Sequence, residues 1–258
     1  MTFRALADVV LAAVLAPRCA VCSIVLQHPL DGAVCTSCWA RITRFTPPCC
    51  ARCGAPLPSP RVADAHGGRC QTCTVGLAGI TAARSVGPFD GALADIVHAL
   101  KYGRRPSIAR LLGPLVRDAA ADLIPEIDVV VPVPLHPRRE RERGFNQAEL
   151  LAEALGLPVC LALTRRVHTG PQATTSAHVR WTNVRDAFAP GRDFRKVAGR
   201  TVALVDDVLT TGATLSAAAT ALRAAAPARV VALTAARAEL VRPSSRPRAP
   251  LPEHPPRR

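Results

Sequence analysis

Apolar residues recur along the chain in two alternating patterns. Apolar runs that predict strands occur at residues 80–86, 127–133, 202–205 and 229–235, and those at 127–133 and 202–205 are typical of strands buried on both faces of a parallel sheet. Apolar residues at helical spacing fill most of the intervening chain, at residues 90–102, 107–123, 146–155 and 213–226. This alternation predicts an α/β fold in which helices flank a parallel sheet.

Both ends of the chain depart from this alternation. Residues 1–17 indicate a short apolar helix, interrupted by Asp8 and followed by Pro17, where a secretory cleavage site needs small residues. The apolar stretch is also shorter than the roughly 20 residues that span a membrane. We therefore expect a docking helix on a cytoplasmic protein without a membrane span, rather than a signal peptide. Residues 238–258 are rich in Pro and Arg and predict a disordered tail.

Cysteines fill the segment between the first helix and the sheet. Residues 18–75 contain four C-x-x-C pairs, namely Cys19/Cys22, Cys35/Cys38, Cys50/Cys53 and Cys70/Cys73. Two such pairs complete a tetrahedral sulfur site, so the segment predicts a zinc-binding module with two structural Zn²⁺ ions. Disulfides are the alternative, which a reducing compartment disfavours. The spacing leaves open whether successive, nested or crossed pairs share a metal. We interpret Cys49 as a bystander, Cys160 as a core residue and His66 as a solvated loop residue.

Charge adds a candidate ligand class. The formal net charge is +14, and arginine supplies nearly all of the positive charge, because Lys101 and Lys196 are the only lysines. Such an excess attracts phosphates or nucleic acid. It equally fits a compositional bias toward Ala, Arg and Pro, so the charge alone does not choose between these readings.

The strand at 202–205 runs into a turn that suits a phosphorylated sugar. The strand ends in two acids, Asp206 and Asp207, and a Thr/Gly loop at residues 208–212 precedes a helix that begins near Ala213. Helix N-termini bind phosphate, whereas carboxylates repel it but accept hydrogen bonds from sugar hydroxyls and attract Mg²⁺. The alternative is a simple helix N-cap. The whole string VALVDDVLTTGATL resembles the signature of type I phosphoribosyltransferases. That resemblance implies that the acids meet the ribose and that the loop holds the 5-phosphate, through Thr210, Thr211, Gly212, Ala213 and Thr214.

A diphosphate needs a second loop, and residues 131–148 offer one after the strand at 127–133. Arginines at positions 138, 139, 141 and 143 supply fork-shaped donors, with a solvated charged loop as the alternative. We expect the diphosphate-side contacts to come from Arg138, Arg139, Arg143, Gly144, Asn146 and Gln147. A third polar stretch, with Gln172 and residues 180–184, has the composition of a mobile lid.

The combination of VPVPLH, RRERERGFNQ, Gln172, RWTNV and VDDVLTTGATL is similar to the ComF family, a phosphoribosyltransferase-like branch linked to competence and DNA uptake. The resemblance implies a double zinc ribbon at 18–75, a phosphoribosyltransferase-like domain at 76–237, and a ligand-binding role for Lys101, which precedes an aromatic residue. It also suggests a role beside a DNA-uptake helicase.

Three functions are compatible with these features. The first is phosphoribosyl transfer from phosphoribosyl diphosphate with Mg²⁺, in which Asp206 and Asp207 are the catalytic acids. The second is a non-catalytic module that binds the ligand or single-stranded DNA. The third is a nucleotide-metabolism enzyme without a link to DNA. No acceptor-selecting base is evident in the sequence.

Overall fold

A four-stranded parallel sheet lies at the centre of the computed structural model, which describes residues 3–61, 67–70, 77–165 and 187–238. The strand order is β1 (Ala82–Pro88), β6 (Arg229–Arg237), β5 (Thr201–Leu209) and β2 (Val129–Pro132). All three pairings are parallel. The four strands are therefore those that the apolar runs predicted, and their parallel arrangement is also as predicted.

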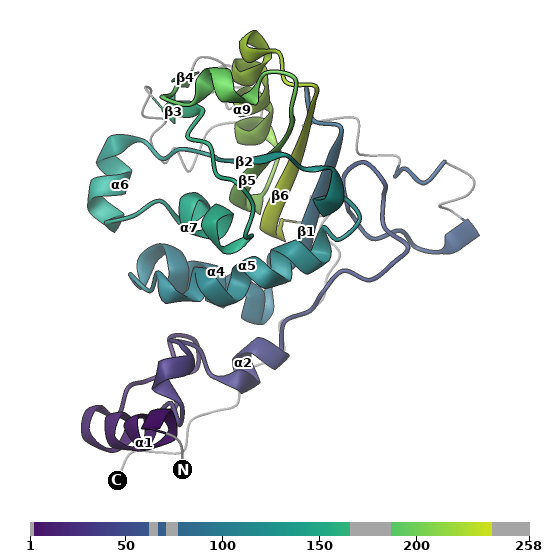
Figure 1. Cartoon of the computed structure of the whole chain (residues 1–258). Coiled ribbons are helices and arrows are strands. Elements are labelled where there is room, and N and C mark those ends of the chain that lie inside the picture. The colour runs from purple at the N-terminus through teal and green to yellow at the C-terminus, as the bar shows by residue number, and fades with distance from the viewer. Residues whose placement is uncertain (1–2, 62–66, 71–76, 166–186, 239–258) are drawn as a thin grey trace, which may run out of the picture.

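Helices cover both faces of this sheet, and each face has its own apolar core (Figure 1). On one face lie α4 (Gly91–Tyr102), α5 (Ser107–Ala119) and α7 (Gln147–Ala154), and on the other lies α9 (Ala213–Leu222). Strand β5 serves both cores, because Ala203 and Val205 face the first while Val202 and Leu204 face the second. Alternate residues of a strand point to opposite faces, so a strand between two helical layers is apolar at every position.

The remaining described elements lie outside the four-stranded sheet and the helices that cover it. The helices are α1 (Phe3–Leu15), α2 (Thr36–Ala40) and α6 (Pro137–Arg143), and β3 (Leu163–Arg165) pairs antiparallel with β4 (Phe188–Pro190). Four single 3₁₀ turns complete the set: Pro29–Asp31, Ile124–Glu126, Phe194–Val197 and Arg223–Ala225.

The sequence prediction was wrong at two places. The arginine run was expected to be a loop, but it forms α6. His136 caps this helix by accepting from the Arg138 N–H, Pro137 occupies its first turn, and Gly144 ends it with a φ of 85°. The second difference lies in β5, which continues to Leu209, so Val208 and Leu209 belong to the strand rather than to the loop expected after the acids.

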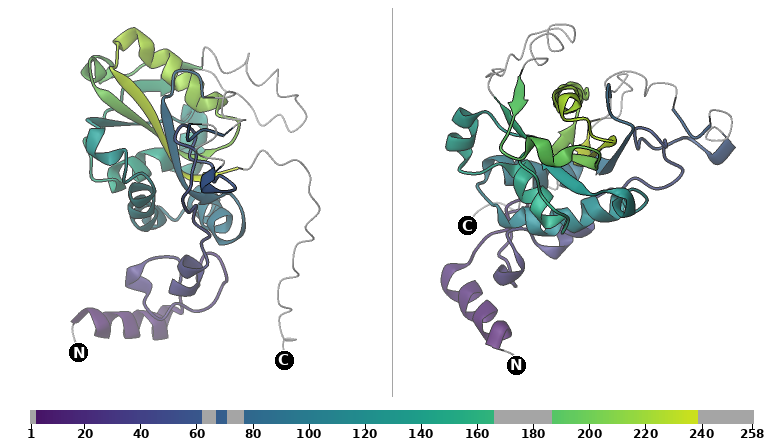
Figure 2. Two further views of the ribbon diagram at one scale, coloured as in Figure 1. Left: turned by 90° about the vertical axis from the view of Figure 1, so that its right-hand side faces the viewer. Right: turned by 45° about the horizontal axis from the view of Figure 1, so that its top comes forward.

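The cysteine-rich segment packs against the sheet domain in two parts. The first part includes α1 and α2 and lies beyond α4 and α5 in both views (Figures 1 and 2). Its helix α1 is docked as predicted, because the buried Asp8 carboxylate accepts a hydrogen bond of 2.9 Å from the Leu30 N–H. The role of Asp8 in the apolar run is therefore to join α1 to the turn at Pro29–Asp31.

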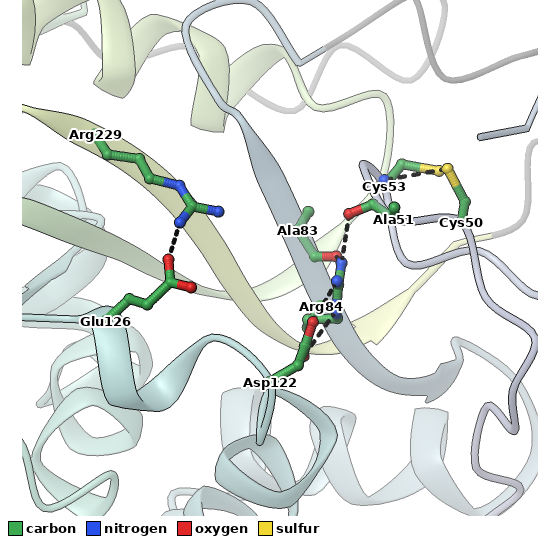
Figure 3. A network of polar contacts seen from close by, with 8 residues as sticks. All are labelled: Cys50, Ala51, Cys53, Ala83, Arg84, Asp122, Glu126 and Arg229. Atoms are coloured by element: carbon green, nitrogen blue, oxygen red, sulfur yellow. Dashed lines mark hydrogen bonds and ion pairs between the residues drawn. The ribbon is translucent and has the colours of Figure 1, made fainter. Parts of the chain in front are cut away.

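The second part follows the outer edge of β1. The Ala83 N–H donates to the Arg52 carbonyl at 2.6 Å, and the Phe45 N–H donates to the Val86 carbonyl at 2.9 Å. Arg84 of β1 donates to the Ala51 carbonyl and pairs with Asp122 at 2.6 Å (Figure 3). Backbone of the cysteine-rich segment thus lies along an edge that would otherwise be unpaired.

Candidate ligand site and metal centres

Residues 206–214, which comprise the two acids and the Thr/Gly loop and are called the acid turn below, lie at the carboxyl end of β5, where ligands bind in open α/β sheets. Gly212 caps α9 with a φ of 78°, a left-handed backbone conformation that glycine adopts most readily. The Ala213 N–H donates to Thr211 Oγ1 at 3.4 Å, whereas the N-cap residue, Gly212, makes no side-chain cap to α9. The Thr/Gly loop therefore places the N-terminus of α9 beside the two acids, as the sequence predicted.

Asp207 is held inside the protein by two side chains from different helices. Its Oδ1 lies 2.7 Å from Lys101 Nζ of α4, and its Oδ2 accepts from Gln147 Nε2 of α7, also at 2.7 Å. Only 5% of Asp207 is exposed. Sequence reasoning directed Lys101 and Gln147 toward the ligand, but the structure brings both to this carboxylate.

Asp206 has different surroundings, although it is the next residue. It is partly exposed, and its Oδ1 accepts from the Asp207 N–H at 2.8 Å. Burial of the carboxyl and the charge of Asp207 raise the pKa of Asp206 to about 7, against the opposing effects of Lys101 and Arg165. Ionised Asp206 is therefore costly in the free protein, and a group that neutralises or hydrogen-bonds it would relieve that cost.

The arginines of α6 are only partly available to a ligand. Arg138 pairs with Glu142 at 3.1 Å on the surface. Arg143 donates to Gln147 Oε1 at 2.9 Å and lies over the Tyr102 ring at 5.2 Å. Buried Asn146 caps α7, because its Oδ1 accepts from the Ala148 N–H while its amide donates to the Val133 carbonyl. Asn146 therefore shapes the loop in this structure.

A cavity of about 290 Å³ lies at the carboxyl end of β2. Its walls come from the end of β2, from α6, α7 and β3, and Arg192 also lines it. Arg165 of β3 stacks over Phe188 at 5.4 Å and interacts electrostatically with Asp206, while burial lowers its pKa. Glu149, which sequence reasoning missed, lines the same cavity, and its pKa is raised by burial and by nearby Glu153 and Glu140. The expected lid residues, Gln172 and residues 180–184, lie outside the described residues.

The first metal centre contains the first two C-x-x-C pairs. The sulfur atoms of Cys19, Cys22, Cys35 and Cys38 all lie within 4.8 Å of one another. The distances are 3.9 Å for Cys19–Cys38 and 3.7 Å for Cys22–Cys35. A zinc–sulfur bond of about 2.3 Å gives a tetrahedral edge of about 3.8 Å, whereas a disulfide needs about 2 Å. The geometry fits zinc, with successive pairs sharing the metal.

Three cysteines of the third and fourth C-x-x-C pairs form a second cluster. Cys50, Cys53 and Cys70 gather within 4.8 Å, and Cys73 lies outside the described residues. The Cys70 and Cys53 N–H groups donate to Cys50 Sγ. Burial alone would raise the pKa of Cys50, but these donors outweigh it and lower the pKa to about 6. A thiolate is the form that binds zinc.

Two further cysteines do not join these clusters. Cys49 donates to the Thr46 carbonyl at 3.4 Å, and Cys160 is buried in the core. Both agree with the sequence interpretation, whereas His66 lies outside the described residues.

Family models match the two parts of the chain separately. A double zinc ribbon domain matches residues 10–76, and a phosphoribosyl transferase domain matches residues 109–248. Competence protein F of Haemophilus influenzae is 31% identical over 201 residues, covering 73% of this chain and 83% of that protein. The chain belongs to the ComF family.

Other ComF relatives match a similar span. DNA utilization protein YhgH of Escherichia coli K12 is 32% identical over 195 residues, covering 71% of this chain and 81% of its own length. Competence protein ComFC of Bacillus subtilis is 29% identical over 199 residues, covering 74% and 78%. The predicted fold class, a phosphoribosyltransferase-like parallel sheet preceded by a zinc-ribbon module, is confirmed. Within the described part of the chain, no helix has the length and apolar character needed to cross a membrane.

Proposed function

We propose that this ComF protein binds phosphoribosyl diphosphate at the acid turn and acts in the handling of DNA taken up by the cell. The observation that carries the proposal is the acid turn itself. It combines a helix N-terminus for the 5-phosphate with a partly exposed carboxylate, Asp206, for the ribose hydroxyls. The names of the relatives support the link to competence and DNA use. Arginines of α6 and an accompanying Mg²⁺ would balance the charge of the diphosphate.

Calorimetric titration with phosphoribosyl diphosphate and Mg²⁺ tests the ligand. Asp206→Asn should weaken binding about tenfold or more, because an amide is a poorer acceptor for sugar hydroxyls. Asp207→Ala is the less clean variant, since it leaves Lys101, whose side chain is only 16% exposed, without its counter-charge. Asp95→Asn in α4, an exposed position, serves as the control. Equal affinity in the wild type and Asp206→Asn would refute the assignment.

Catalysis requires a further test. In transfer, the bond from ribose C1 to the diphosphate oxygen breaks, and an acceptor nitrogen or other nucleophile bonds to C1 as diphosphate leaves with the electron pair. Mass-spectrometric screening of bases and amines would detect diphosphate and the new product together. Release of diphosphate with none of the acceptors would leave ligand binding as the function.

Single-stranded DNA is a second candidate ligand because of one exposed aromatic residue. Tyr102 is 70% exposed and borders Arg143, and Arg104 donates to the Glu142 carbonyl, which joins the α4–α5 turn to α6. Stacking next to arginines suits unpaired bases. Fluorescence anisotropy with oligothymidylate should show affinity that falls steeply with salt, and Tyr102→Ala should weaken it more than Tyr102→Phe. Salt-independent or absent binding would remove this candidate.

A further inference from the structure

Four side chains form a continuous line through the site. Arg143 at the end of α6 donates to Gln147 Oε1, Gln147 Nε2 donates to Asp207 Oδ2, and Lys101 completes the line at Asp207 Oδ1. The distances are 2.9, 2.7 and 2.7 Å in that order. The line joins the arginine-bearing helix to the acid turn through side chains alone.

The amide orientation of Gln147 follows from the chemistry at both of its ends. A guanidinium can only donate, so the oxygen of the amide must face Arg143. An ionised carboxylate can only accept, so the NH₂ group must face Asp207. Amide orientation commonly has to be assigned from such networks. Here both partners require the same assignment.

Burial makes this line rigid. Gln147 is 3% exposed and Asp207 is 5% exposed, so water cannot readily replace a partner that is lost. A buried acceptor or donor left without its partner costs about 1–3 kcal/mol. Asp207 therefore has little freedom to turn toward a ligand while Lys101 and Gln147 hold it.

We infer that Gln147 and Lys101 are positioning residues, which hold the Asp207 carboxylate in place through its two oxygens. Arg143 acts through Gln147, so it connects the diphosphate side of the site to the ribose side. The identity of the ligand rests on the proposed function, whereas the positioning roles rest on the contacts of Asp207.

The decisive ligand is ribose 5-phosphate, because it has no diphosphate for Arg143 to touch. Its affinity is measured by NMR titration, which reaches millimolar dissociation constants. Arg143→Met and Gln147→Met should each weaken the binding of ribose 5-phosphate about fivefold or more. The double variant should bind it no more weakly than Gln147→Met does. Arg143→Lys should restore most of the affinity, because lysine is also a donor. Arg110→Met, an exposed arginine of α5, is the charge-matched control.

Three results would overturn the inference. They are wild-type affinity in Arg143→Met, multiplicative losses in the double variant, or equal weakening by Arg110→Met.

Thermal melts identify variants that fail to fold, and the isosteric Gln147→Glu provides a second probe. Gln147→Glu places a carboxylate against Asp207 while it keeps the contact with Arg143. It should therefore weaken the binding of ribose 5-phosphate at least as much as Gln147→Met does. Wild-type affinity in folded Gln147→Glu would also refute the positioning role.

A ligand-free measurement separates this inference from the proposed function. The side-chain NH₂ protons of Gln147 should exchange with solvent at least tenfold faster in Arg143→Met than in the wild type or Arg143→Lys. Unchanged exchange in Arg143→Met refutes the inference whatever the ligand is. A wild-type protein that binds neither ribose 5-phosphate nor phosphoribosyl diphosphate refutes the proposed function and leaves the exchange result standing.

Discussion

Asp206 and Asp207 differ because their neighbours differ. Asp207 has a lysine and an amide donor at its two oxygens, and its charge adds to the burial that raises the pKa of Asp206 to about 7. The folded state therefore keeps a proton on Asp206 between about pH 4 and pH 7, where the unfolded chain has released it. Stability from this group is present at low pH and is lost as pH rises through that window.

Asp206→Asn should accordingly stabilise the protein more as the pH rises, while it weakens ligand binding. Asparagine imitates the neutral acid, so urea unfolding should show a stabilisation at both pH values that is about 1–2 kcal/mol larger at pH 8.5 than at pH 6. Zinc is kept in the buffer at both values so that the thiolate centres remain loaded. An equal gain at both pH values, or none at pH 8.5, would contradict the raised pKa.

The residues of the site were predictable in identity and less so in role. The order of acids, threonines and glycine indicated the turn, because that chemistry is local. The partners of Asp207 were not visible, since Gln147 lies 60 positions away and meets it only after α7 packs on the sheet. A donor that serves a ligand and a donor that serves a carboxylate look the same in a sequence.

Elements followed the same division between local and distant causes. Strands β2, β5 and β6 were predictable from their apolar runs, which are typical of burial on both faces. Helix α6 was not, because its charged sequence has no apolar stripe and its stability comes from caps at both ends. The cysteine pairing was also undetermined, since spacing fits several arrangements and only the fold selects successive pairs.

A matched pair of glycines tests the contact between the cysteine-rich segment and β1. Gly54 and Gly199 both have a φ of +68°, but a Cβ at Gly54 would lie 2.6 Å from the Ala83 carbonyl oxygen, whereas at Gly199 it meets open space. Alanine at either position is strained by about 1 kcal/mol. Gly54→Ala should lose a further 1–3 kcal/mol, roughly, through displacement of the segment. Chemical unfolding that gives the same loss for both variants would contradict this close contact.

At the scale of the whole molecule, the two metal centres should differ in their effect on the fold. Cys38 and Cys53 are each 1% exposed, so their serine variants remove ligands of equal burial. Only the second centre adjoins the β1 edge, and Arg237 at the end of β6 donates to the Cys53 carbonyl at 2.5 Å. Cys53→Ser should therefore lower the melting temperature more than Cys38→Ser, with Cys49→Ser as the control.

Zinc content by mass spectrometry completes this comparison. The wild type should carry two zinc ions and each ligand variant should carry one, whereas Cys49→Ser should keep both. A larger loss of melting temperature from Cys38→Ser than from Cys53→Ser would contradict the structural role of the second centre.

The covered edge of β1 has a consequence for how the protein aggregates. At the other side of the sheet, Val130 exchanges hydrogen bonds of 2.8 Å with Pro158 and Cys160, so β2 is flanked too. Release of the second zinc would free the segment along β1 and bare a row of backbone donors and acceptors. Such a row is a template on which another molecule can add a strand. Metal depletion would then lead to intermolecular strand addition and aggregation while the sheet itself is still folded.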